Sequence, residues 1–159
     1  MNIDLWILLR ILISLTFIPR SSGFFFKTGG VTSLETPEKR LQGVGVRGRL
    51  LCGRTPLNAT KVKIVDVDIR PDPDDLLSET LTDVNGLFQV AGATREDTII
   101  EVLIKIYHDC LDLHRPCQRK VIWKVPAVYY NNGTLTEWFD VGTVNMEIVF
   151  PQEERDCRH

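Results

Sequence analysis

Two runs of alternating apolar and polar residues flank a short segment bounded by Cys110 and Cys117. The first run ends at Tyr107 and the second begins at Lys120. Because the side chains of a β-strand alternate between its two faces, this pattern predicts two strands joined by a short connection. Cysteines at both ends of the connection favour a disulfide bond, which persists only in an oxidising compartment. The segment therefore indicates a β protein that is exported from the reducing cytosol.

The chain has four cysteines, an even number that allows three pairings. Proximity in the sequence favours a Cys110–Cys117 bond, which leaves Cys52 to pair with Cys157. The second bond would tie the C-terminal tail to the first strand. By closing a long loop it would contribute about 4 kcal/mol to stability.

The beginning of the chain favours secretion. Residues 1–23 have the layout of a signal peptide. An apolar stretch, interrupted by Arg10, is followed by small residues, which predict cleavage after Gly23. An uncleaved anchor or a buried helix are the alternatives. Residues 24–42 show no sustained alternation and are expected to form a flexible N-terminal lead. Asn58 and Asn132 begin glycosylation sequons in turn-like surroundings, as expected for an extracellular glycoprotein.

From residue 43 to residue 157 the chain consists of short apolar runs separated by turn residues, without a helical period. This pattern predicts one all-β domain, a two-sheet β-sandwich of about seven or eight strands. The clearest strand is expected over residues 100–107. A change of parity at Ile64 and Val65 predicts a bulge or a bend, because alternation cannot otherwise skip a residue.

Several shorter features complete the expected fold. A turn is predicted over Asp83–Gly86, a hairpin turn over Asn131–Gly133, and a closing strand through Val144, Met146, Ile148 and Phe150. One short helix is possible within Asp74–Glu79.

The charge pattern excludes one class of partner and indicates a candidate surface. A formal net charge of −2 is unlike the strongly basic field that nucleic acid requires. Arg119, Lys120 and Lys124 are expected on or near the solvent side of one strand, where they would form a small basic strip. This strip is the candidate binding site for an acidic head group, and an ordinary charged sheet face is the alternative.

Two groups of residues have the composition of metal sites. His108, Cys110, His114 and Cys117 could bind zinc on paper, but oxidation of the thiols in a secreted chain argues against it. Aspartates around two prolines could supply oxygen ligands to Ca²⁺; the candidates are Asp72, Asp74 and Asp75. Their spacing lacks the glycine and distal glutamate of a known calcium loop, so a solvated loop is the alternative. No metal or cofactor is therefore expected.

The sequence gives no support for catalysis. It has no serine framed as a nucleophile, no H-E-x-x-H zinc motif and no phosphate-binding glycine loop. A histidine at the end of a strand is more often structural than catalytic.

Blocks distributed over residues 43–157 resemble the nematode transthyretin-like family of small secreted proteins. These blocks are Val46-x-Gly48-x-Leu50-x-Cys52, Pro73-Asp74-Asp75-Leu76-Leu77, Thr82-Asp83-x-x-Gly86-x-Phe88, Lys105-Ile106-Tyr107-His108-Asp109-Cys110, Cys117-Gln118-Arg119-Lys120, Val141-Gly142-Thr143-Val144-Asn145 and Glu154-Arg155-Asp156-Cys157. The resemblance implies a transthyretin-like, immunoglobulin-like sandwich with a signal peptide and paired cysteines.

The resemblance implies less about activity. Some members are thought to bridge exposed phosphatidylserine and a cell-surface receptor. The related hydroxyisourate hydrolases end in Tyr-Arg-Gly-Ser, whereas this chain ends in Arg155-Asp156-Cys157-Arg158-His159, which removes the main support for hydrolysis. We therefore expect a secreted binding or adaptor module, without enzymatic activity, for a lipid or a protein partner outside the cell. A carrier of a small hydrophobic ligand is the alternative.

Overall fold

The computed structural model describes residues 38–68, 74–112 and 115–158. The predicted signal peptide and most of the predicted lead lie outside these residues. The first strand, β1 (Arg40–Cys52), begins earlier than the expected start of the domain, because Arg40, Leu41 and Gln42 continue the ladder with a neighbouring strand.

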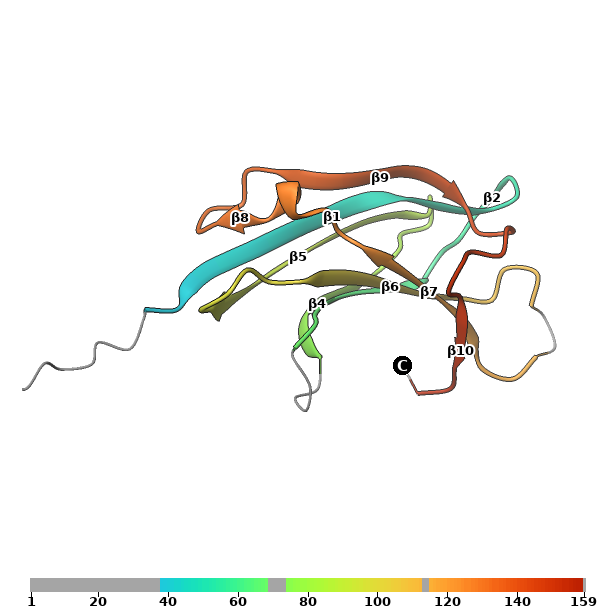
Figure 1. Ribbon diagram of the computed structural model, residues 1–159. Helices are drawn as coiled ribbons and strands as arrows, with labels where there is room; N and C mark the ends of the chain where they lie inside the picture. Colours follow the sequence, from blue (N-terminus) through green and yellow to red (C-terminus); the bar gives the residue numbers. More distant parts are fainter. Residues whose placement is uncertain (1–37, 69–73, 113–114, 159) are drawn as a thin grey trace, which may run out of the picture. The chain divides into compact units, whose positions relative to one another are not determined.

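Two five-stranded sheets form the domain, which confirms the predicted all-β sandwich (Figure 1). The first sheet contains β1, β2 (Thr55–Pro56), β5 (Leu87–Glu96), β8 (Asn131–Asn132) and β9 (Trp138–Asn145). The second contains β3 (Lys61–Asp66), β4 (Asp75–Leu81), β6 (Val102–His108), β7 (Gln118–Lys124) and β10 (Glu154–Asp156). A short 3-10 helix, η1, spans Ala127–Tyr129. The expected number of strands was too low because β2, β8 and β10 are too short to show alternation.

In the first sheet, β1 is the central strand. It pairs with β5 in antiparallel fashion from Arg40↔Glu96 to Arg49↔Leu87, and with β9 in parallel fashion. The hairpin predicted at Asn131–Gly133 is wrong. Strands β8 and β9 both pair with β1, the first antiparallel and the second parallel, so the intervening loop reverses the chain along one edge.

The second sheet confirms the predicted irregularity at Ile64 and Val65, where the register between β3 and β4 shifts. The short helix considered within Asp74–Glu79 is not formed, because this segment pairs with β3 as β4. The clearest predicted strand is β6, which pairs with β3 on one side and β7 on the other.

The core lies between the sheets and consists of inward-facing aliphatic side chains of both. Its fully buried members include Val44, Val46, Leu50, Val62, Ile64, Val102, Ile104, Ile106, Val121 and Met146. The predicted closing strand is only partly correct. Strand β9 ends at Asn145, Met146 is buried beyond it, and Ile148 is 57% exposed in a loop.

The turn predicted over Asp83–Gly86 is formed, and it links β4 of the second sheet to β5 of the first. Asp83 Oδ1 accepts hydrogen bonds from the backbone N–H groups of Asn85 and Leu87, both within 2.9 Å. Gly86 has a φ of +76°, and its carbonyl oxygen accepts a hydrogen bond from the Leu50 N–H group at 2.8 Å. A β-carbon at Gly86 would collide with the Leu50 carbonyl oxygen.

We therefore expect Gly86→Ala to lower the free energy of unfolding by more than the about 1–2 kcal/mol that a left-handed conformation costs an alanine. Gly133→Ala is the matched control, because Gly133 has a φ of +82° but a β-carbon added there would meet no atom within 4 Å. Urea denaturation of both variants measures the difference. Equal losses would show that the contact with Leu50 is unimportant.

Candidate functional site at the disulfide-bonded end

Two disulfide bonds lie at the same end of the sandwich. Cys52 at the end of β1 pairs with Cys110, with a Cα–Cα distance of 5.6 Å, and Cys117 pairs with Cys157, with a Cα–Cα distance of 4.4 Å. All four cysteines are therefore oxidised, as predicted. The first bond links the two sheets, and the second links the start of β7 to the C-terminal segment.

The favoured pairing of Cys110 with Cys117 and of Cys52 with Cys157 is wrong. Cys110 is 3% exposed and is directed toward the interior, where it meets the end of β1. Cys117 is partly exposed and meets the C-terminal segment, because β10 pairs with β7. Proximity along the sequence therefore did not correspond to proximity of the side chains.

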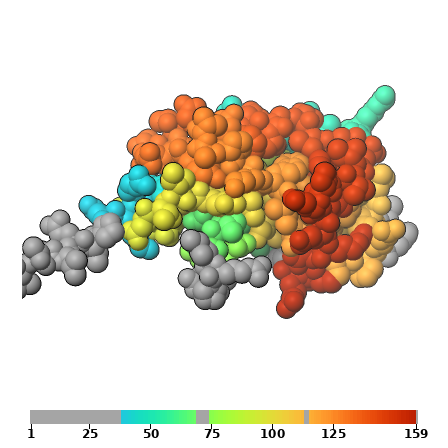
Figure 2. Space-filling view, viewed as in Figure 1, coloured from blue at the N-terminus to red at the C-terminus, as the bar shows by residue number. Residues whose placement is uncertain are grey.

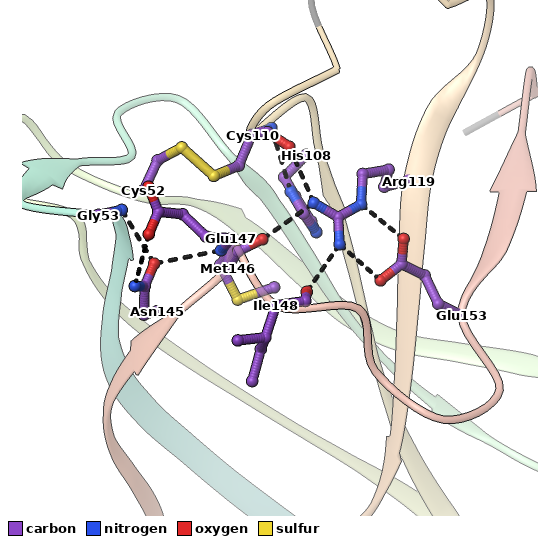
Figure 3. The surroundings of a disulfide bond; sticks show 10 residues. All are labelled: Cys52, Gly53, His108, Cys110, Arg119, Asn145, Met146, Glu147, Ile148 and Glu153. Atoms are coloured by element: carbon purple, nitrogen blue, oxygen red, sulfur yellow. Dashed lines mark hydrogen bonds and ion pairs between the residues drawn. A yellow bond between two sulfur atoms is a disulfide. The ribbon is translucent and has the colours of Figure 1, made fainter.

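Arg119 on β7 is the centre of the polar contacts at this end (Figure 3). Its side chain is buried and forms two hydrogen bonds with the Glu153 carboxylate, at 2.5 and 2.8 Å. The same guanidinium donates to the carbonyl oxygens of Cys110, Met146 and Ile148, at distances between 2.7 and 3.0 Å. Its hydrogen bonds lower the pKa of Glu153. One side chain thus fixes the connection after β6 and the segment between β9 and β10.

The predicted basic strip does not form a cationic surface. Arg119 does not face solvent, so its expected position is wrong. Hydrogen bonds to Glu154 and Asp156 raise the pKa of Lys120, although burial alone would lower it. Lys124 lies 2.8 Å from Glu101, and that hydrogen bond raises the Lys124 pKa. Carboxylates therefore already balance the charges of both lysines.

The predicted metal ligands are not brought together in the described part of the chain. Asp72 and His114 lie outside it. Asp74 accepts a 2.7 Å hydrogen bond from Lys105, and Asp75 begins β4. Within residues 38–68, 74–112 and 115–158, no group of three or more potential metal ligands is found. The cysteines of the zinc alternative are in disulfide bonds and cannot bind as thiolates.

Both predicted glycosylation sites are accessible. Asn58 is exposed between β2 and β3, and Asn132 is exposed on β8. Their modification stays a prediction.

A groove that the sequence did not predict opens beside the second disulfide. This end groove has a volume of about 680 Å³ and is lined by Leu111, Asp112, Arg115, Arg119, Glu147, Val149, Glu153, Glu154 and Arg155. In Figure 2 the C-terminal residues, in red, form the right-hand side of the molecule next to gold residues of the 110–120 region.

Aliphatic groups, guanidiniums and carboxylates of both kinds of acidic residue all line the end groove. Leu111 and Val149 are 71% and 79% exposed, although they are aliphatic. Arg155 is paired with Asp112, and the hydrogen bond between them lowers the Asp112 pKa. The Arg115 side chain, by contrast, forms no ion pair within 4 Å among the described residues, although its charge also helps to lower the pKa of Asp112. The sequence contained one indication of this exposed aliphatic site. Leu111 is apolar and directly follows Cys110, so it lies beyond the end of β6, in the connection between two strands.

The fold and its covalent bonds define a disulfide-bonded, two-sheet β-sandwich, and comparisons with known proteins identify its family. A model described as the transthyretin-like family matches residues 47–126. Transthyretin-like protein 33 of Caenorhabditis elegans is 46% identical over 119 residues, which cover 74% of this chain and 83% of the relative. Transthyretin-like protein 46 of the same organism is 43% identical over 76% of this chain and 69% of the relative. The chain belongs to the transthyretin-like family, which confirms the predicted resemblance.

The disulfide bonds fit an extracellular protein. Among the residues that the structure describes, no helix has the length and apolar character needed to cross a membrane.

His108 is buried beside Arg119 and is expected to make stability depend on pH. Its Nδ1 accepts a hydrogen bond from the Cys110 N–H group at 3.3 Å, and its buried Nε2 has no described partner. Burial and the Arg119 guanidinium lower the pKa of His108 from 6.5 to about 4. The folded protein therefore resists protonation of this ring more than the unfolded chain does.

The contribution of His108 to stability should be complete above pH 6.5 and should fall by about 3 kcal/mol as the pH drops from 6.5 to 4. Chemical denaturation across this range, compared with His108→Gln, isolates the effect from that of the carboxylates. The variant should show a flatter profile. If the free energy of unfolding of His108→Gln depended on pH between 6.5 and 4 as steeply as that of the unchanged protein, the buried, neutral state of His108 would be contradicted.

Proposed function

We propose that this chain is a secreted, non-enzymatic binding module that acts as an adaptor, and that the end groove is its contact surface. One observation carries this proposal: Leu111 and Val149 expose their aliphatic side chains in the same groove in which the Arg115 guanidinium forms no ion pair within 4 Å among the described residues. Exposed aliphatic groups that are grouped together mark interaction sites more often than isolated ones do.

The chemistry of these groups favours an anionic lipid surface as the partner. Aliphatic side chains at a loop tip can enter the boundary between head groups and acyl chains, where their burial is favourable. A guanidinium at the same level can donate hydrogen bonds to phosphate or carboxylate oxygens. Phosphatidylserine presents both kinds of oxygen, and it is the lipid that the family resemblance implies. A cell-surface receptor is the other partner expected for an adaptor.

The end groove suits this role better than the lysine strip. A head group at Lys120 or Lys124 would first have to displace Glu154, Asp156 or Glu101. Arg115 forms no ion pair within 4 Å in the described structure, so a head group there would not have to break one. The charged lining of the end groove also argues against a carrier of a purely apolar ligand at this site.

Cosedimentation of the oxidised, secreted chain with liposomes tests the proposal. We expect binding to phosphatidylserine vesicles and not to phosphatidylcholine vesicles, with or without Ca²⁺. Val149→Asp should weaken this binding about tenfold, because it places a charge where the membrane would otherwise bury an exposed aliphatic side chain. Val128→Asp is the matched control, since Val128 is 76% exposed on η1, outside the end groove.

Each outcome separates the parts of the proposal. Equal binding by Val149→Asp and the unchanged chain would refute the end groove as the contact surface. Absence of binding to any vesicle, together with retained binding to cells, would replace the lipid with a protein receptor.

A further inference from the structure

A second groove lies on the outer face of the first sheet, independent of the end groove. Arg47 and Arg49 alternate along β1 with the buried residues Val46 and Leu50, so both arginines project away from the core. Residues two apart on a strand lie about 7 Å apart. This arginine groove has a volume of about 510 Å³ and is lined by Arg47, Gly48, Arg49, Leu87, Phe88, Gln89, Asp140, Gly142 and Thr143. Its volume is within the range of small-molecule sites.

A bulge in β9 shapes the groove. Arg47 is opposite Asp140 and Arg49 is opposite Thr143, so two residues of β9 face the single residue Gly48. Gly142 in the bulge has a φ of +69°. A β-carbon at Gly48 would collide with the Val141 side chain, which explains why glycine stands between the two arginines. Bulges of this kind redirect side chains and are frequent beside functional sites.

Both guanidinium groups are held in place through Nε. Arg47 Nε donates to Asp140 Oδ2 at 2.9 Å, and Asp140 Oδ1 accepts from the Gly142 N–H group at 2.8 Å. Both hydrogen bonds lower the pKa of Asp140, and the one from the Gly142 N–H group has the larger effect. Arg49 Nε donates to the Asn85 carbonyl oxygen at 2.9 Å, in the turn that Asp83 fixes. One anchor, Asp140, is on β9 beside the bulge, and the other, Asn85, is in the turn before β5, so both arginines are oriented by the fold itself.

The terminal nitrogens of these arginines are available for a ligand. In the part of the chain that the structure describes, neither Arg47 nor Arg49 donates a hydrogen bond from Nη1 or Nη2. Among the described residues that line the groove, Asp140 is the only one with a carboxylate, so the groove keeps an excess positive charge. Leu87, which is 49% exposed, adds an apolar surface beside the two guanidiniums.

We propose that the arginine groove binds a small amphiphilic anion, whose carboxylate, sulfate or phosphate group accepts hydrogen bonds from Arg47 and Arg49 and whose apolar part contacts Leu87. Paired guanidinium donors match the geometry of oxyanions, and anchoring reduces the entropy lost when they bind. This proposal does not depend on lipid binding at the end groove.

Isothermal titration calorimetry of the oxidised chain tests the site, with octyl sulfate, octanoate and octyl phosphate as probes below their micelle concentrations. We expect saturable binding of at least one probe at one site. Inorganic sulfate should bind more weakly because it lacks the apolar part, and octyltrimethylammonium should not bind. The ranking of the three anions identifies the preferred oxyanion.

Variants locate the binding site. Arg47→Gln and Arg49→Gln should each weaken binding of the best probe about tenfold, the value of one charge-assisted hydrogen bond. Arg54→Gln is the matched control, because Arg54 is exposed and lies outside the groove. Thermal unfolding of each variant shows that it remains folded. Absence of saturable binding, or equal losses in all three variants, would overturn the proposal.

Discussion

The burial of one charged side chain, Arg119, organises the disulfide-bonded end of the sandwich. Burying a charge is unfavourable unless it is paired and fully hydrogen-bonded, and Arg119 satisfies this condition through Glu153 and three carbonyl oxygens. These acceptors belong to the connection after β6 and to the segment between β9 and β10. Both segments carry the exposed residues of the end groove, so its shape depends on Arg119.

The two proposed sites depend on different parts of β1. Its end carries Cys52, which fixes the Cys110 connection on one side of the end groove. Its middle carries Arg47 and Arg49, whose positions follow from the bulge in β9 and from the turn before β5. The central strand of the first sheet therefore provides a rigid support for both surfaces. The end groove combines aliphatic tips with charge, whereas the arginine groove presents two fixed cations.

Local patterns predicted most of the fold and little of the candidate sites. Alternation predicted β6, and the change of parity predicted the irregularity at Ile64 and Val65, because both depend only on neighbouring residues. The disulfide pairing and the parallel pairing of β9 depend on contacts between distant segments, and sequence proximity gave the wrong result for both. Arg119 had a local signal, since it shares the parity of the buried Val121. Its charge suggested solvent exposure instead.

The most direct test of the role of Arg119 is the free energy of unfolding of Arg119→Met, measured by urea denaturation of the oxidised chain. Loss of the guanidinium leaves the Glu153 carboxylate without its partner, so the variant should lose about 3–5 kcal/mol. Arg115→Met, in the same groove but exposed, should stay within about 0.5 kcal/mol of the unchanged protein. Equal, small effects of the two substitutions would contradict the account in which Arg119 holds this end of the sandwich together.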